Sequence, residues 1–387
     1  MVKILKLNEI SPAANKVFPA SYNVAKDVEK PEGIMLRSFS MHDYPLNDEL
    51  LAIARAGAGT NNIPVDKCAA KGIVVFNTPG ANANAVKELV ISALLMSSRK
   101  IVPGIEWANS LKGKGEEVAK LIEKGKNNFV GAEIYGKKLG VIGLGAIGAL
   151  VANAAISLGM DVLGYDPYIS VDNAWTLSRG VKRITDFTEL LKECDYITIH
   201  VPLTSSNKFM FNQETFNIMK NGSVLINCSR GELVNNADVI TAVTSGKLSR
   251  YVTDFPSDEL LNEENIICVP HLGASTPEAE DNCAYMAAQE LVDYIENGNI
   301  THSVNFPDCQ VNKNGSVRVT ILHLNQKEML SKITAKFSSL GQNIANLINK
   351  SQGEYAYSIV DLDSDVNSSI TSELMQIEGV IKARLIR

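Results

Sequence analysis

A glycine-rich segment in the middle of the chain constrains the fold more than any other feature. Gly143, Gly145 and Gly148 have the spacing G-x-G-x-x-G directly after the apolar run Leu139–Ile142. The first glycine permits a tight turn, the second lets the backbone approach a pyrophosphate, and the third lets a helix pack closely on the strand. Free N–H groups at the start of that helix attract phosphate. The segment therefore predicts a dinucleotide-binding βαβ unit.

The residues around the glycines indicate which dinucleotide binds. Ala146 and Ile147 complete the loop, small residues follow it, and Asp166 ends the next apolar run. A carboxylate at that place accepts hydrogen bonds from ribose hydroxyls and repels a 2′-phosphate, which favours NAD over NADP. The alternative is a structural turn with a solvated Asp166, but the strand, helix and acid in this order make the cofactor prediction specific.

Short apolar runs alternate with helical stretches along most of the chain. Between residues 139 and 269 this alternation predicts a parallel sheet with helices on both faces. Three further strands are expected near the N-terminus, before a buried helix. The expected strands are Gly33–Ser38, Leu51–Ala56, Ile73–Asn77, Leu139–Ile142, Val162–Tyr165, Ile197–Val201, Val224–Cys228, Tyr251–Thr253 and Ile266–Val269. The fold class is therefore α/β.

The last part of the chain has a different pattern. A helix is expected from about Ser275 to Asn297, and residues 306–315 have the composition of a linker. Strands are then expected over 317–323, 355–362 and 380–386, and helices over 328–340 and 370–377. With one more strand near 343–350 the order is βαββαβ, which predicts a small α+β domain over residues 316–387.

Bulk properties exclude several classes of protein. With 387 residues the chain is too long for one ordinary core. A net charge of −6 gives no support to nucleic-acid or membrane-surface partners, and no apolar run reaches the ~18 residues of a membrane span. Six cysteines without a C-x-x-C pair argue against structural zinc and a disulfide framework. We expect no metal, and a reducing, cytoplasmic location.

Polar residues at the predicted strand ends suggest chemistry on an alcohol. Its oxidation beside a carboxylate needs a base for the hydroxyl proton, a cation for the oxyacid and an acid that orients the base. His271 and Arg230 each follow a strand, and Asp254 opens an acidic segment that also contains Asp258 and Glu259. Each residue taken alone is as readily structural, but their joint placement favours an active site.

Several stretches carry a resemblance to a known family. They are Gly57–Asn62, Asn77–Gly80, Glu88-Leu89, Val141–Gly148, Asn227–Gly231 and Pro270–Thr276. Through them the chain resembles the D-isomer-specific 2-hydroxyacid dehydrogenases over most of residues 33–306. The resemblance implies a discontinuous, flavodoxin-like substrate domain (1–93 and 275–305) around a Rossmann NAD-binding domain (94–274).

The resemblance also implies roles for individual residues. Arg230 binds and polarises the substrate, His271 is the acid/base, and Glu259 pairs with His271. Members of the family usually have proline after this glutamate, whereas Leu260 follows Glu259 here, so Asp258 stays the alternative partner. The implied cofactor contacts comprise the glycine loop and Asp166, together with Val201, Pro202, Cys228, Ser229, Arg230, Asp254, His271 and Gly273.

The implied substrate is a small phosphorylated acid. The resemblance suggests NAD-dependent oxidation of D-3-phosphoglycerate to 3-phosphohydroxypyruvate, the first step towards L-serine. The backbone of Ala56, Gly57 and Ala58 would hold the carboxylate. Candidates for the remaining contacts are Arg37, Ser38, Arg55 and Lys87, although each cation is as readily a surface charge.

Residues 317–387 resemble an ACT domain, a small amino-acid-binding module. By this resemblance His323, Asn325 and Asn343 would hold an effector such as L-serine. The proline and glycine that usually follow the first motif are replaced by Lys327 and Glu328. An ACT domain that serves only dimerisation is therefore the alternative. The family resemblance further implies a homo-oligomer, either a dimer or a tetramer.

Two other functions stay open at this point. The first is an NAD-dependent dehydrogenase of an unphosphorylated D-2-hydroxy acid. The second is a non-catalytic NAD-sensing regulatory protein, a class found in the same superfamily. Arg230, Glu259 and His271 together argue against the non-catalytic alternative.

Overall fold

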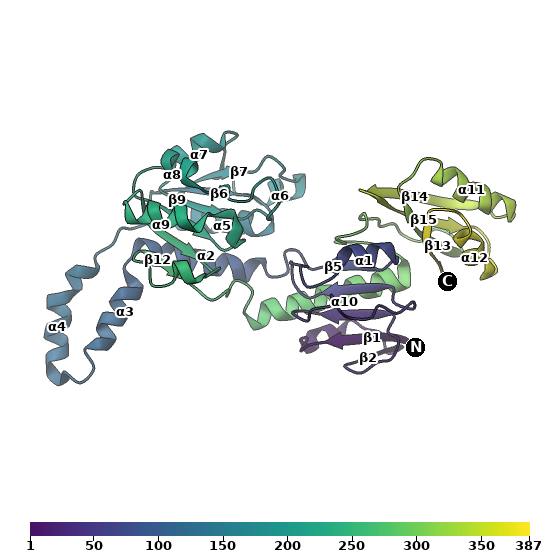
Figure 1. Ribbon diagram of the computed structural model, residues 1–387, viewed down its shortest axis with the longest axis horizontal. Helices are drawn as coiled ribbons and strands as arrows, with labels where there is room; N and C mark the ends of the chain where they lie inside the picture. The colour runs from purple at the N-terminus through teal and green to yellow at the C-terminus, as the bar shows by residue number, and fades with distance from the viewer. The chain divides into compact units, whose positions relative to one another are not determined.

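The computed structural model describes residues 1–387 and contains two compact units (Figure 1). One unit comprises Met1–Ala81 and Pro277–Arg387, so both ends of the chain build it. The other comprises Asn82–Thr276. The finer division into substrate domain, NAD-binding domain, linker and ACT domain stays a prediction.

The unit Asn82–Thr276 is built on a seven-stranded parallel sheet with the order β12-β11-β10-β9-β6-β7-β8. Central strand β6 pairs with β7 on one side and β9 on the other, so the strand order reverses there and dinucleotides are expected at its carboxyl end. The strands are β6 (Lys138–Ile142), β7 (Asp161–Tyr165), β8 (Lys182–Arg183), β9 (Tyr196–Ile199), β10 (Ser223–Asn227), β11 (Leu248–Thr253) and β12 (Ile266–Cys268).

Helices cover both faces of this sheet, as the alternating apolar runs predict. One apolar core forms around Ile197 and Leu225, and the other around Val141 and Ile226. Two further helices, α3 and α4, extend away from the sheet as a hairpin (Figure 1). The helices are α2 (Ala83–Ser98), α3 (Ile101–Ser110), α4 (Val118–Gly125), α5 (Ala146–Ser157), α6 (Val171–Thr176), α7 (Phe187–Glu193), α8 (Gln213–Ile218) and α9 (Asn236–Thr244).

The other unit contains a five-stranded parallel sheet with the flavodoxin-like order β2-β1-β3-β4-β5. Its strands are β1 (Val2–Leu7), β2 (Tyr22–Ala25), β3 (Gly33–Leu36), β4 (Ala52–Arg55) and β5 (Val74–Asn77). The long helix α10 (Pro277–Asn297) packs on it through buried residues such as Ala287 and Leu291. Gly298 ends α10 with a φ of 70°, as the sequence predicts.

The C-terminal residues form a four-stranded antiparallel sheet, β14-β15-β13-β16, in the predicted order βαββαβ. Its elements are β13 (Val317–Leu324), α11 (Met329–Ser339), β14 (Ile344–Gln352), β15 (Tyr355–Leu362), α12 (Ser369–Met375) and β16 (Val380–Ile386). One face buries Ile333 and Phe337 of α11. The other places Leu322 and Tyr357 in the same core as α10. The predicted fold class is confirmed.

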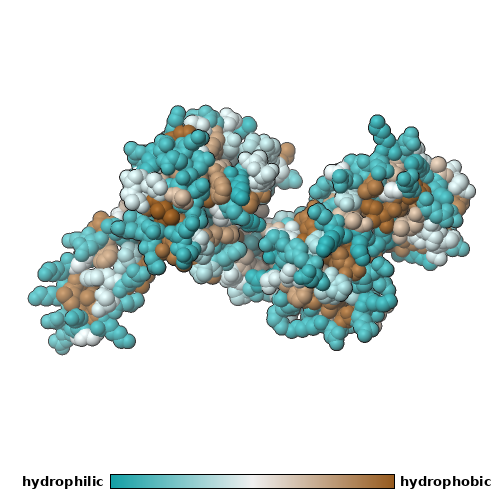
Figure 2. Space-filling model, viewed as in Figure 1, coloured by the Kyte–Doolittle hydropathy of each residue, from teal (hydrophilic) through white to brown (hydrophobic).

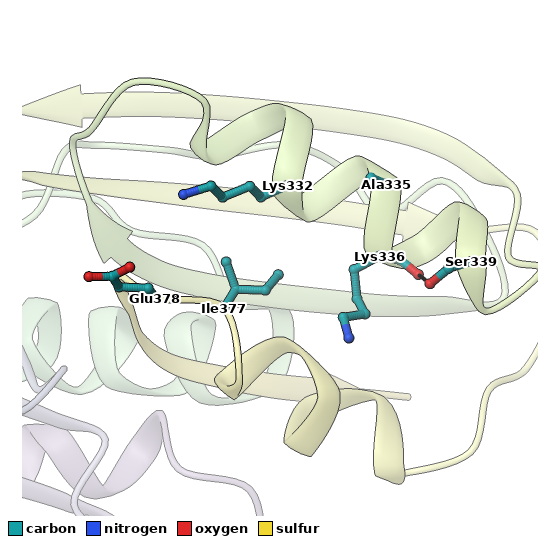
Figure 3. Close-up of a pocket in the computed structure, with 6 residues that line it drawn as sticks. All are labelled: Lys332, Ala335, Lys336, Ser339, Ile377 and Glu378. Carbon is teal, nitrogen blue, oxygen red and sulfur yellow. Dashed lines mark hydrogen bonds between the residues drawn. The ribbon is translucent and has the colours of Figure 1, made fainter.

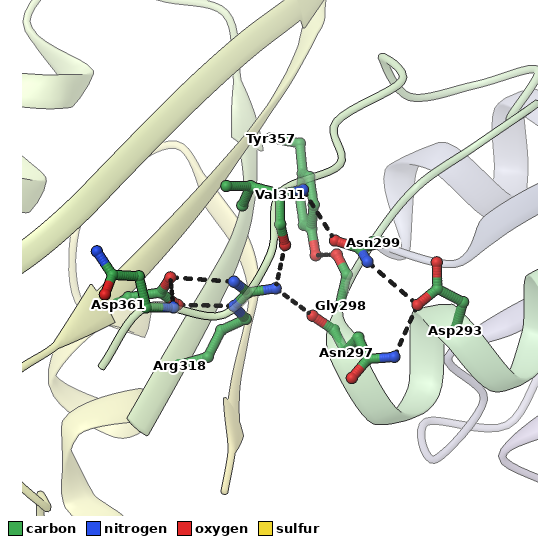
Figure 4. Close-up of polar contacts among 9 residues, drawn as sticks. Asp293, Asn297, Gly298, Asn299, Val311, Arg318, Tyr357 and Asp361 are labelled. Atoms are coloured by element: carbon green, nitrogen blue, oxygen red, sulfur yellow. Dashed lines mark hydrogen bonds and ion pairs between the residues drawn. The ribbon is translucent and has the colours of Figure 1, made fainter. Parts of the chain in front are cut away.

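A buried arginine joins this C-terminal sheet to the end of α10 (Figure 4). Arg318 is fully buried and donates to both carboxylate oxygens of Asp361, at 2.7 and 3.0 Å. Its Nη1 also donates to the carbonyl oxygens of Asn297 and Val311. Because Asn297 is the last residue of α10, Arg318 satisfies one of the carbonyl groups that the end of a helix leaves without a partner.

Candidate active site

The glycine loop has the geometry that the sequence predicts. Gly143 has a φ of 87°, in the left-handed region that favours glycine. A Cβ on Gly148 would lie 1.9 Å from the carbonyl oxygen of Gly143, so only glycine lets α5 approach the loop this closely. A Cβ on Gly145 would meet nothing within 4 Å. Gly145 also precedes α5 without a side-chain cap, which leaves N–H groups available to a phosphate.

Two alanine substitutions should separate folding from cofactor binding. Gly148→Ala forces α5 away from the loop and should destabilise the protein by roughly 1–3 kcal/mol, as overpacking does. Gly145→Ala finds open space and should leave thermal unfolding unchanged, while its methyl group obstructs the pyrophosphate and weakens NAD binding. Thermal unfolding and NADH fluorescence titration measure the two effects. Unchanged NADH affinity in Gly145→Ala would remove this loop from the cofactor site.

Asp166 stabilises the same loop. Its Oδ2 accepts a hydrogen bond from the Leu144 N–H at 2.9 Å, and its Oδ1 accepts one from the Tyr168 N–H at 2.8 Å. Each carboxylate oxygen can accept more than one hydrogen bond. Asp166 is therefore both a support of the loop and an available acceptor for ribose hydroxyls.

The loop after β10 carries Arg230 and is held by a residue that the sequence interpretation missed. Asn227 is fully buried, its Nδ2 donates to the Arg230 carbonyl oxygen at 2.8 Å, and its Oδ1 accepts from the Ser229 N–H. Ser229 Oγ donates to the carbonyl oxygen of Val201 at 2.6 Å, which joins two of the predicted cofactor segments. The available signal was an amide residue directly after the apolar run Val224–Ile226.

His271 and Asp254 lie together beyond the ends of β12 and β11. The His271 N–H donates to the carbonyl oxygen of Asp254 at 3.0 Å, and His271 has a left-handed φ of 49°. Its ring packs on Phe255 with centroids 4.9 Å apart. Asp254 is 1% exposed, and its Oδ1 has no hydrogen-bond partner. Burial raises the pKa of the Asp254 carboxyl, whereas the charges of His271 and Arg230 act to lower it.

The predicted partner of His271 is Glu259, with Asp258 as the alternative. Glu259 and Asp258 lie on the short 3-10 helix Asp258–Leu260, and both are exposed. No hydrogen bond or ion pair joins either carboxylate to His271. The acid near His271 is instead Asp254, on the neighbouring strand end. The pairing of Glu259 with His271 stays a prediction.

His200 is not a competing acid/base. Burial lowers its pKa to about 3, so its ring is neutral at physiological pH. Its Nε2 lies 3.0 Å from Thr198 Oγ1. His200 is therefore a structural residue behind Val201 and the glycine loop.

In the other unit, the predicted substrate loop follows β4. Gly57 has a φ of 147°, and a Cβ there would lie 2.3 Å from Nη1 of Arg55, so glycine allows the guanidinium to lie across the loop. Asn77 Nδ2 donates to the Ala58 carbonyl oxygen at 2.6 Å, and the Thr78 N–H donates to that of Gly57. The loop is thus fixed from β5, and it brings together Arg55 and the backbone of residues 56–58.

Arg37 and Lys87, the further candidate cations, each lie beside an acidic side chain. Arg37 follows β3 and its Nη1 lies 2.5 Å from Oε1 of Glu280 on α10. Lys87 on α2 lies 3.5 Å from Oε1 of Glu88. Ser38 is exposed beside Arg37. Burial raises the pKa of the Cys283 thiol, and the charges of Arg37 and Arg55 both act to lower it. The two arginines therefore lie near the same part of α10.

The predicted effector residues have partners within their own domain. His323 is 2% exposed and its Nε2 lies 3.1 Å from Asn349 Oδ1. Asn325 donates to the Gly353 carbonyl oxygen, and Asn343 pairs with Asp363. None of the three lines the cavity of about 420 Å³ between α11 and the segment after α12 (Figure 3). Its lining is Lys332, Ala335, Lys336, Ser339, Ile377 and Glu378.

In the unit Asn82–Thr276 the strand ends therefore combine a glycine loop, an acceptor for ribose, a cation and a histidine beside a buried acid. This arrangement can bind a dinucleotide and place a proton-transferring group and a cation near its reactive end. No group of three metal-ligating side chains is present, and no helix is long and apolar enough to cross a membrane. Fold and site define the class of pyridine-nucleotide-dependent dehydrogenases.

Comparison with known proteins identifies the family within that class. The family model described as the NAD-binding domain of D-isomer specific 2-hydroxyacid dehydrogenases matches residues 91–273. A relative from Haemophilus influenzae named D-3-phosphoglycerate dehydrogenase is 33% identical over 87% of this chain and 82% of its own length. The enzyme of that name from Escherichia coli strain K12 is also 33% identical, over 88% of this chain and 82% of its length.

The chain belongs to the D-isomer-specific 2-hydroxyacid dehydrogenase family, and its named relatives at this identity are D-3-phosphoglycerate dehydrogenases. A solved structure points the same way. The NAD⁺-bound 3-phosphoglycerate dehydrogenase of Entamoeba histolytica is 27% identical, with a TM-score of 0.59 over 79% of this chain and 98% of that one. The family resemblance and the prediction of NAD as cofactor are confirmed, and the protein is an NAD-dependent D-2-hydroxyacid dehydrogenase.

Proposed function

We propose that the protein oxidises D-3-phosphoglycerate to 3-phosphohydroxypyruvate with NAD, the first step towards L-serine. The observation that carries this proposal is the similarity to relatives of that name over most of both chains. The two arginines near the substrate loop support it, because a phosphorylated acid needs cations beyond the one that holds its carboxylate.

The proposed chemistry assigns each group one task. His271 would accept the hydroxyl proton of the substrate, and bound NAD would supply the hydride acceptor. Arg230 holds the carboxylate and polarises the developing carbonyl. A fixed cation stabilises such developing charge more strongly where water is excluded. An acid keeps the His271 ring oriented. The pH dependence of kcat/KM in Glu259→Gln and in Asp254→Asn identifies that acid, because loss of the hydrogen-bonding partner should change this dependence more than loss of a nearby charge.

The substrate is tested by the rate of NADH formation with D-3-phosphoglycerate, D-glycerate and D-lactate. We expect a strong preference for the phosphorylated acid. Arg55→Met should raise its KM by about tenfold or more, since charge-assisted contacts contribute roughly 1.5–3 kcal/mol. The rate with D-glycerate should be nearly unchanged in that variant.

Equal rates with D-3-phosphoglycerate and D-glycerate would assign the enzyme to an unphosphorylated acid. NAD binding without turnover of any hydroxy acid would instead support the non-catalytic NAD-sensing alternative. Added L-serine tests the ACT-domain prediction in the same assay. An unchanged rate at saturating serine would leave His323, Asn325 and Asn343 with structural roles only.

We propose that the protein is a homo-oligomer that pairs through the hairpin of α3 and α4. Figure 2 shows exposed apolar side chains on this hairpin, among hydrophilic ones. Exposed apolar surface of this kind is often covered by a partner subunit. Ile101 and Ile105 of α3 and Ile122 of α4 are exposed, as is Val130 in the segment that follows α4. A single species of 41.9 kDa in sedimentation equilibrium would contradict the proposal.

We also propose a cytoplasmic location. All six cysteines are free thiols, and a protein of a reducing compartment has no need of disulfides. Cell fractionation of the tagged protein tests this directly, and recovery outside the cytoplasm would contradict it.

A further inference from the structure

A cavity of about 580 Å³ lies along α10 in the unit built from both chain ends. It is not part of the proposed cofactor, substrate or effector sites. Residues of α10, the N-terminal segment and the chain just after α10 line it. They are Val17, Met286, Gln289, Glu290, Val292, Asp293, Asn297, Asn299, Thr301 and His302.

One side chain of the lining lacks a partner. Glu290 is 7% exposed, and its Oε1 lies within hydrogen-bond distance of His302 Nδ1, at 2.9 Å. Its Oε2 is buried and has no hydrogen-bond partner. Buried polar atoms in folded proteins are almost always hydrogen-bonded, because an unmade bond leaves the full desolvation penalty. The missing partner of Oε2 is therefore expected to come from outside the chain.

The remaining lining limits what that partner is. Asp293 Oδ1 accepts from the side-chain amides of Asn297 and Asn299, so a second carboxylate is held in place (Figure 4). The lining includes no lysine or arginine. Met286 and Val292 add apolar surface. A metal ion is not favoured, because no group of three metal-ligating side chains is present.

We propose that this cavity binds a small alkylammonium compound whose ammonium group donates to Glu290 Oε2 and whose alkyl chain packs on Met286 and Val292. An ammonium group offers three donors and a positive charge to an acidic lining. A free amino acid fits less well, since its carboxylate would face two acids without a cation to pair with.

The cavity is joined to the substrate loop by two hydrogen bonds. His302 has a left-handed φ of 59°, and its carbonyl oxygen accepts from the Asn77 N–H at 3.3 Å. Asn77 in turn donates through its side chain to the Ala58 carbonyl oxygen. An occupied cavity therefore restrains the segment that fixes this loop. That consequence rests on the proposed function, whereas the binding itself does not.

Isothermal titration calorimetry on the full-length protein tests the binding with n-butylammonium chloride. We expect saturable binding, and no saturable binding of 1-butanol or sodium butyrate at the same concentrations. Glu290→Gln keeps the shape and an acceptor for His302, so the fold should persist while n-butylammonium binding weakens by at least about tenfold. Glu296→Gln, on the exposed side of the same helix, is the matched control and should bind as the parent does.

Proton release gives a second readout. Burial raises the pKa of the Glu290 carboxyl to about 9, with a further contribution from Asp308. His302 and Asp293 also face the cavity. Glu290 is thus protonated at pH 7.5 in the free protein, and it must lose its proton to pair with an ammonium group. Binding should release nearly one proton and should strengthen about tenfold per pH unit until pH 9, while the amine itself stays charged up to about pH 10.

Three binding results would overturn the proposal. They are no saturable binding of n-butylammonium by the parent, equal binding by Glu290→Gln, and binding of 1-butanol as tight as that of the amine. A change of sedimenting mass in Glu290→Gln would assign the cavity to a contact between subunits and overturn it as well. None of these readouts uses catalysis, so each is distinguishable from failure of the proposed dehydrogenase activity.

Discussion

His271→Asn should lower kcat/KM by roughly 10²–10⁴-fold while NAD still binds, because a positioned acid/base contributes about that much to proton transfer. Asparagine is the better replacement than alanine, since His271 has a φ of 49° and asparagine tolerates the left-handed region. The glycine loop and Asp166, which we expect to bind the cofactor, are unchanged in this variant. Steady-state rates with D-3-phosphoglycerate and NADH fluorescence titration measure the two quantities.

The control for that experiment is His42→Asn, which changes an exposed histidine of the other unit and should leave turnover intact. Near-normal kcat/KM in His271→Asn would remove His271 from the mechanism. Loss of NADH binding together with turnover would show instead that the substitution disturbs the end of β12.

Arg318→Met should destabilise the protein by about 3–5 kcal/mol, the largest loss of stability that we expect from any of these substitutions. The change leaves the Asp361 carboxylate buried without its guanidinium, and it removes a donor from the carbonyl oxygens of Asn297 and Val311. Urea unfolding followed by circular dichroism measures this loss of stability. If unfolding is two-state, the midpoint falls while the slope of the unfolding free energy against urea concentration stays the same.

Arg387→Met in the same sheet domain is the matched control. Its ion pair with Asp365 spans 3.4 Å between side chains that are 59% and 72% exposed, so solvent screens it and the expected loss is at most about 1 kcal/mol. Equal stabilities of the two variants would show that the Arg318–Asp361 pair does not hold the C-terminal sheet against α10. The double replacement Arg318→Met with Asp361→Leu should recover much of the loss, since neither charge is then left unpaired.

Local patterns were sufficient to predict most elements of this fold. The glycines at 143, 145 and 148 act through their own backbone and through contacts a few residues away, so their spacing alone specifies the loop. β1 and β2 were not predicted, because polar residues interrupt the apolar pattern of short strands such as Val2–Leu7, of which only Ile4 and Leu5 are buried. Pairing with β3 in the sheet determines that strand.

The candidate site was predictable only in part. Arg230 and His271 follow strands, and parallel topology brings strand ends to one edge, so their proximity follows from sequence. The support from Asn227 and the approach of Asp254 to His271 depend on the register between neighbouring strands, which one sequence does not reveal. The partners of His323, namely Asn349 and Ser358, lie on two other strands and could not be predicted from the sequence for the same reason.

The discontinuous unit can be completed only late in the synthesis of the chain. Residues 1–81 supply five parallel strands, but the helix that covers one face of their sheet begins only at Pro277. The 195 residues from 82 to 276 are made in between, which takes about 10–40 s at usual rates of translation. The contiguous unit can fold during this time, whereas the apolar surface around Ala54 and Phe76 stays uncovered until α10 is synthesised. We therefore expect newly made chains of this protein to expose this apolar surface until α10 has been synthesised.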